Sequence, residues 1–216
     1  MYSQFGQEQF VLNFFNNKKN GVFFEAGGMD GQRHSNTWRL EKEFGWTGLM
    51  VEPSPSLYSD LVKNRTCHSE NVLLGSGVEY TYLHIKEPED MEEICGSAGL
   101  SGVVEFYDPR HLERIERRTK ETRAMTEKLK MKTVPLQSLF EKYNITDIDY
   151  FSLDTEGSEL DILKTVDFEK INIKLLGVEF NYESETKTYD FIIHKGFKPI
   201  TKLGPDIIFK NISGFE

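Results

Sequence analysis

Cysteine is scarce in this chain of 216 residues. The two cysteines, Cys67 and Cys95, form no CxxC pair and do not fall in the His/Cys spacing of a zinc site. The sequence therefore suggests neither a disulfide framework nor a zinc site. No apolar run reaches the roughly 18 residues of a membrane helix, and the opening MYSQFGQEQF lacks the basic and apolar regions of a secretory leader. We expect no membrane partner and a cytoplasmic location.

Positive charge is also in short supply. The sequence holds 26 Lys and Arg against 35 Asp and Glu, for a formal net charge of −9. An acidic chain has no overall field that attracts phosphate, so nucleic acid is not an expected partner. Only residues 108–132 run against this balance, and their basic excess is typical of a solvated helix with i,i+4 charge pairs.

Short apolar runs alternate with helical patterns along most of the chain, which predicts βαβ units and a mostly parallel sheet. We predict a single domain over residues 1–216, with 86–132 as a helical insertion that could serve as a lid or substrate region. The predicted strands are 21–25, 48–51, 71–74, 78–85, 149–153, 175–180, 197–200 and 207–209, the last two forming a hairpin. The predicted helices are 35–44, 55–64, 109–130, 136–143, 158–166 and 185–195.

The first strand runs directly into a glycine loop, FFEAGGMDG, with Glu25 before the glycines and Asp30 after them. Ligands of open α/β sheets bind at the carboxyl ends of strands, where glycine lets the backbone approach closely. Acids beside the loop would repel a pyrophosphate, so this is not the dinucleotide fingerprint. The pattern instead suits a ligand with a cationic end, such as S-adenosylmethionine (SAM). The alternative is a plain strand-to-helix corner with solvated acids.

Three further strands also end in acids. Glu52 follows the glycine loop at the spacing where an acid binds ribose hydroxyls. Asp154 and Glu156 end a later strand and could orient a hydroxyl, act as general base or hold a divalent cation, although Glu156 could instead cap the next helix. Glu179 would bring a fifth acid to this rim, and such crowding should raise a pKa or require a counter-cation.

Among the histidines, His34 lies just beyond the glycine loop and is the best candidate base, because the pKa of histidine lies near neutrality. A solvent-exposed side chain without a role is the alternative for this residue. His111, at the start of the predicted long helix, could also reach a substrate.

Several segments together resemble the FkbM family of SAM-dependent methyltransferases: SQFGQEQF, FFEAGGMDG, SNTWRLEKEFGWTGLMVEPSP, YFSLDTEGSELDIL and LLGVEFN. The resemblance spans Ser3 to Phe209 and implies a Rossmann-like class I methyltransferase fold, an α/β structure of seven strands with the last strand antiparallel. It also implies that Glu25, Gly27 and Asp30 contact the amino-acid part of SAM. The full set of candidate cofactor-binding residues is Gln7, Glu25, Gly27, Asp30, Ser35, Glu52 and Pro53, with Gln4 and Asn36 nearby.

The predicted function is transfer of a methyl group from SAM to a hydroxyl of a small molecule or sugar. Asp154, Glu156 and His34 are the candidate catalytic residues, and Asp154, Glu156 and Glu179 are candidate ligands if a divalent cation is used. Three alternatives remain. The fold could be a degenerate one used for binding or scaffolding, the basic segment could serve a nucleic-acid methyltransferase, or the cofactor could be NAD or a nucleotide sugar.

Overall fold

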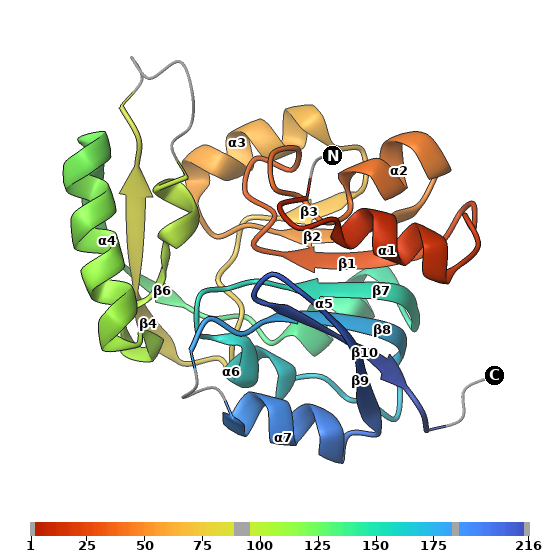
Figure 1. Ribbon diagram of the computed structural model, residues 1–216. Helices are drawn as coiled ribbons and strands as arrows, with labels where there is room; N and C mark the ends of the chain where they lie inside the picture. Colours follow the sequence, from red (N-terminus) through yellow and green to blue (C-terminus); the bar gives the residue numbers. More distant parts are fainter. Residues whose placement is uncertain (1–2, 89–95, 183–185, 214–216) are drawn as a thin grey trace.

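The computed structural model describes residues 3–88, 96–182 and 186–213, which form two sheets flanked by helices (Figure 1). The larger sheet contains β1 (Val22–Ala26), β2 (Thr47–Val51), β3 (His68–Glu70), β7 (Asp147–Leu153), β8 (Asn172–Glu179), β9 (Phe197–Leu203) and β10 (Asp206–Asn211). The smaller sheet contains β4 (Glu79–Lys86), β5 (Gly102–Val103) and β6 (Met125–Lys132). The helices are α1 (Gln7–Phe14), α2 (Trp38–Phe44), α3 (Pro55–Asn64), α4 (Pro109–Thr122), α5 (Leu136–Tyr143), α6 (Glu159–Leu163) and α7 (Thr186–His194), with short 3₁₀ turns η1 (Ala98–Leu100) and η2 (Val104–Phe106).

The large sheet has the strand order β3-β2-β1-β7-β8-β10-β9. The pairings of β3, β2, β1, β7 and β8 are parallel, whereas β10 is antiparallel to both of its neighbours. This arrangement confirms the predicted α/β fold with an antiparallel last strand. The strand order reverses between β1 and β7, and open α/β sheets bind ligands at the carboxyl ends of strands beside such a reversal.

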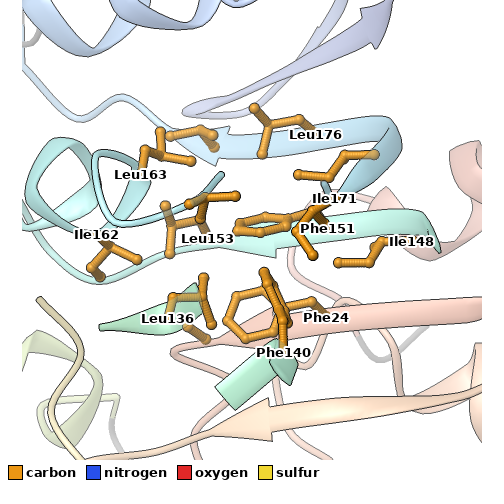
Figure 2. Close-up of a cluster of buried hydrophobic side chains, with 14 of the residues drawn as sticks. Phe24, Leu136, Phe140, Ile148, Phe151, Leu153, Ile162, Leu163, Ile171 and Leu176 are labelled. Atoms are coloured by element: carbon orange, nitrogen blue, oxygen red, sulfur yellow. The ribbon is translucent and has the colours of Figure 1, made fainter. Parts of the chain in front are cut away.

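Both faces of the large sheet are buried, because neighbouring residues of each strand point to opposite sides. Phe23 packs with Leu40 on the side of α1, α2 and α3, whereas Phe24 packs with Phe140 on the side of α5, α6 and α7. Figure 2 shows the second cluster, where Phe24, Phe140 and Phe151 gather between β1, β7 and α5. The continuous apolar runs of the sequence are therefore central strands.

The long charged helix is shorter than predicted. It begins at Pro109, with Asp108 as N-cap, but ends at Thr122, because Arg123 adopts a left-handed conformation with a φ of 57°. The remainder, Met125–Lys132, is strand β6, which pairs antiparallel with β4. Its Lys-Leu-Lys-Met-Lys stretch alternates with a period of two, so that Leu129 packs inward and its neighbours face water. The prediction of helix to residue 130 was wrong.

Two other expectations need correction. The third strand of the large sheet is His68–Glu70 and not 71–74, where Leu74 makes only an isolated bridge to Val134. The segment 86–132 is not simply helical either, because it supplies two strands to an antiparallel sheet on which α4 packs through Ile115. In Figure 1 this small layer stands at one end of the large sheet. No helix in the described ranges combines the length and apolar character that a membrane crossing needs.

Candidate functional site

The main cavity lies where β1, β2, β7 and β8 end. The smaller sheet and the turn before it form the opposite wall, with Tyr82 of β4 and Leu100 of η1 among the lining side chains. The cavity is thus enclosed between the two sheets. The lining residues from the strand ends are Ala26, Gly27, Val51, Glu52, Pro53, Asp154, Glu156 and Glu179.

Gly27 brings the loops after β1 and β7 together. Its φ is +83°, and a Cβ at this position would lie 1.7 Å from the carbonyl oxygen of Asp154. Only glycine can therefore occupy the position. The close approach fixes the backbone of both loops at the cavity wall.

Glu25, predicted to contact the ligand, points away from the cavity. Its carboxylate accepts hydrogen bonds from Ser35 Oγ (2.8 Å), the Asn36 N–H (2.6 Å) and Thr37 Oγ1. The guanidinium of Arg65, itself buried, lies 3.8 Å away. Glu25 is therefore a buried anchor for the segment that leads into α2, and it is absent from the cavity lining.

Asp30 also serves the local chain. Its Oδ1 accepts hydrogen bonds from the N–H groups of Gln32 (3.0 Å) and Arg33 (2.8 Å), and its Oδ2 accepts one from Arg33 Nε (2.7 Å). Asp30 is buried and absent from the cavity lining. Asp30 shapes the turn after the glycine loop and does not line the cavity.

Two further members of the predicted set lie behind the wall. Gln7 donates to Asp206 Oδ2 (2.7 Å) and accepts from the Phe5 N–H (3.0 Å). Ser35 is fully buried and its Oγ accepts from Trp38 N–H at the start of α2 (3.1 Å). Gln4, by contrast, lines the cavity. The structure therefore separates the predicted residues into cavity lining and supporting shell.

Glu52 is a buried acid in the cavity wall, followed by Pro53. Burial raises the pKa of Glu52 to about 8, and hydrogen bonds from the N–H groups of Ser54 (2.8 Å to Oε1) and Met29 offset this only in part. At neutral pH the side chain therefore carries a proton and can both donate and accept hydrogen bonds.

The other three acids form one cluster. Asp154, Glu156 and Glu179 each place a carboxylate oxygen within 4.8 Å of the others. Burial raises the pKa of Asp154 to about 7, and the charge of Asp206 adds to the shift. Burial, followed by the charge of Asp154, also raises the pKa of Glu179. The predicted crowding of acids is confirmed for these three and Glu52, while Glu25 lies outside the group.

The cluster can act in two ways. A carboxylate with a pKa near neutrality is suited to accept a proton from a hydroxyl. Three carboxylate oxygens at this separation can also hold a divalent cation, which prefers oxygen ligands. His34 lines the same cavity from the turn before α2, where its φ is 61°.

The sequence predicted that residues 86–132 could form a lid or substrate region, but it did not show which side chains of the small sheet and α4 line the cavity. Tyr82, Val103 and Arg114 line the cavity, but their positions depend on the packing of β4, β5 and α4, which no local pattern reveals. The Gly/Ser-rich run 96–102 forms part of this wall. A second cavity adjoins the first at Glu156, and no sequence pattern predicted it.

Solved structures with a similar fold include three methyltransferases. Precorrin-6y C5,15-methyltransferase from Geobacter metallireducens GS-15 is 8% identical over 94% of this chain and 84% of its own, with a TM-score of 0.44. A human methyltransferase 10 domain containing protein is 10% identical over 94% and 78%, with a TM-score of 0.40. Phosphoethanolamine N-methyltransferase 1 from Haemonchus contortus, solved with phosphoethanolamine and S-adenosylhomocysteine, is 11% identical over 97% and 40%, with a TM-score of 0.38.

A search of curated proteins finds no match. The model of the methyltransferase FkbM domain, however, matches residues 6–199, which is most of the chain. That range includes the glycine loop after β1, the turn after β7 that contains Gly157, and all four acids of the cavity. The chain belongs to the FkbM family of methyltransferases.

Proposed function

We propose that the protein transfers a methyl group from SAM to a hydroxyl oxygen of a small molecule or sugar. The observation that carries this proposal is the cluster of Asp154, Glu156 and Glu179 in a cavity at the reversal of strand order. Family membership supports the reaction class, and the cluster supports the choice of an acceptor that must lose a proton.

The cavity suits a cationic ligand. Among the described residues that line it, four are acids and one, Arg114, is a lysine or arginine. Besides burial, the charges of neighbouring acids raise the pKa of Asp154 and of Glu179, so the carboxyl cluster lacks sufficient counter-charge. A ligand with a sulfonium and an ammonium would supply that charge. We place its ribose at Glu52 and its sulfonium end toward Asp154 and Glu156, with Gly27 allowing close backbone approach.

When bound, SAM supplies an electrophilic methyl carbon on sulfur. Gly27 and Glu52 would hold this donor, and it would supply an in-line displacement in which the acceptor oxygen takes the methyl group and sulfur keeps the electron pair of the broken carbon–sulfur bond. Asp154 accepts the hydroxyl proton, because its pKa of about 7 is matched to this task near neutral pH. Glu156 and His34 are the other candidates for this role. The remaining contribution of the protein is to hold the reacting groups in line.

The second cavity is the proposed entry for the acceptor. It shares Glu156 with the main cavity, so a molecule bound there would reach the carboxyl cluster from the side of α4 and α6. Aromatic side chains for ring contacts and polar groups for hydroxyls both occur in its lining. These lining residues include Phe106, Tyr107, Tyr182, Asn181, Lys164 and Lys187.

A divalent cation is a second candidate ligand for the cluster, favoured by the separation of the three carboxylates. If Mg²⁺ binds there, it should raise the melting temperature of the wild type but not that of Glu179→Gln. Transfer activity should then fall on treatment with EDTA and return with Mg²⁺. Equal melting temperatures with and without Mg²⁺ would leave the proton-accepting role as the function of the cluster.

The first experiment is a thermal-shift titration of the full chain with SAM and with S-adenosylhomocysteine (SAH). A ligand at 100 times its Kd adds about 2.7 kcal/mol to the unfolding free energy, which is a readily measured shift. NAD and UDP-glucose serve as controls and should give no shift. The absence of stabilisation by SAM and SAH, or a larger shift with NAD, would contradict the proposal.

The nucleic-acid alternative is less well supported by the structure. Charged groups along α4 are paired on its surface, with Lys120 Nζ 2.6 Å from Glu116 and Arg118 3.2 Å from Glu121. A solvated helix of this kind needs no polyanion. Steeply salt-dependent RNA binding that is lost in an Arg114→Gln/Arg117→Gln variant would revive this alternative.

The scaffold alternative predicts SAM binding without transfer. An Asp154→Ala/Glu156→Ala variant that binds SAM as well as the wild type, in a chain that methylates no acceptor, would support it. The proposed enzyme should instead lose transfer in this variant while remaining folded.

A further inference from the structure

One histidine of the insertion reaches into the carboxyl cluster. His111, in the first turn of α4, is only 1% exposed. Its Nδ1 lies 3.3 Å from Oε2 of Glu156, which belongs to the turn after β7. The two residues come from different layers of the molecule, so their contact joins the insertion to the main sheet.

The orientation of the His111 ring is fixed from its other side. Nε2 lies 3.3 Å from the carbonyl oxygen of Leu100, and since that oxygen can only accept, Nε2 carries the hydrogen. The ring stacks near Tyr107 at 4.6 Å between centroids and meets Tyr182, whose hydroxyl lies 3.4 Å from Nδ1. Nδ1 is thereby directed at Glu156.

Glu156 needs such support because of its place in the chain. It has a φ of 57°, followed by Gly157 at 114°, and its side chain lies where the two cavities meet. A carboxylate there could turn toward either cavity. Its Oε2 is held by His111 and by Asn181 Nδ2, each at 3.3 Å. Burial lowers the pKa of His111, and the contact is attractive when the ring is protonated and Nδ1 donates a hydrogen bond to the Glu156 carboxylate.

We propose that His111 is a positioning residue, which orients the Glu156 carboxylate toward the methyl donor and so makes the insertion part of the active site. The inference rests on the proposed function, because it assumes that Glu156 faces the sulfonium of SAM. SAM and SAH differ at that point, since the sulfur of SAH is uncharged. The ratio of their affinities therefore reports the orientation of Glu156.

Two amide substitutions separate the contacts of His111. In His111→Asn the amide nitrogen takes the place of Nδ1 and can still donate to Glu156, whereas in His111→Gln it takes the place of Nε2 and reaches only Leu100. Both changes cost similar packing, so a purely structural role would affect them alike. Leu112→Ala, at an exposed neighbour on α4, is the control for the helix itself.

The measurement is isothermal titration calorimetry of the full chain with SAM and SAH. We expect His111→Gln to weaken SAM binding about fivefold to tenfold, the range of one charge-assisted hydrogen bond, and SAH binding less than about twofold. His111→Asn should keep the wild-type ratio within about twofold. The positioning role is overturned if Asn and Gln change the ratio equally, or if neither changes it. Failure of the wild type to bind either ligand would instead refute the proposed function.

Discussion

The turns after β1 and β7 look alike in sequence, yet their acids have different roles. Each turn follows a buried strand, with an acid at or next to the end of the strand and a glycine shortly after it. Glu25, the second-last residue of β1, receives three hydrogen bonds, lies close to Arg65 and is buried. Asp154, after β7, faces the cavity among other acids, and burial raises its pKa to about 7. An acid at a strand end therefore indicates the correct edge of the sheet, but the surrounding donors decide whether it supports the site or acts in it.

The largest expected effect comes from the contact that joins the two turns. Gly27→Ala would place a methyl group 1.7 Å from the Asp154 carbonyl oxygen, at a φ that disfavours side chains. Since backbone must move, we expect a loss of about 3 kcal/mol or more in unfolding free energy, and no detectable SAM binding. Urea denaturation and calorimetry check both. Gly77→Ala, where a Cβ would have no neighbour within 4 Å, is the matched control at positive φ.

Two isosteric substitutions test whether Glu25 supports the fold and Asp154 acts in the site. Glu25→Gln removes the charge from a buried network, so the unfolding free energy should fall by about 2 to 4 kcal/mol. Asp154→Asn removes a charge that burial already disfavours, so stability should be unchanged or higher. Its effect should appear in transfer of labelled methyl groups from SAM, which should drop by about 10² to 10⁴. If Asp154→Asn is the more destabilising of the two, the assigned roles of the turns are reversed.

Much of this architecture could be predicted because it depends on local patterns. The continuous apolar runs placed β1, β2, β7 and β8, and the predicted helix 55–64 matches α3, which begins at Pro55 with Ser54 as its N-cap. The edge of the sheet that carries the site follows from these elements alone. The helix boundary near Arg123 was missed because residues 109–130 are charged throughout, which hides the change from helical to strand periodicity.

The candidate site was only half predictable for a different reason. Glu52, Gly27 and Asp154 lie in the cavity as expected, since their positions follow from strand ends. The orientation of Glu25 depends on Arg65, which is forty residues away on the chain and contacts it only through the packing of α3. No sequence pattern encodes such a contact. His111 likewise reaches Glu156 only through the folding of the insertion.

A pH effect is expected at Glu52. Its pKa is about 8 in the folded protein and 4.5 in the unfolded chain, so its contribution to stability is complete below pH 4.5 and is lost as the pH rises through 8. The unfolding free energy should therefore fall across this window, by at most about 1.4 kcal/mol per pH unit from this group. Glu52→Gln should flatten the decline. Urea denaturation from pH 5 to pH 9 measures both proteins, and parallel profiles would show that Glu52 does not titrate in this window.

The smallest expected effect is that of Asp30 on SAM affinity, because the family resemblance and the structure predict different contacts for this side chain. The resemblance implies that Asp30 contacts the amino-acid part of SAM, whereas in the structure its carboxylate is engaged by Gln32 and Arg33 and is absent from the cavity wall. Asp30→Asn keeps one acceptor oxygen for the turn, so stability should fall by only about 1 kcal/mol. SAM affinity by calorimetry should change less than about twofold, because no ligand contact is lost. A tenfold weakening at unchanged stability would mean that the turn after β1 opens to bind the cofactor, and the difference between the two turns would then hold only for the unliganded protein.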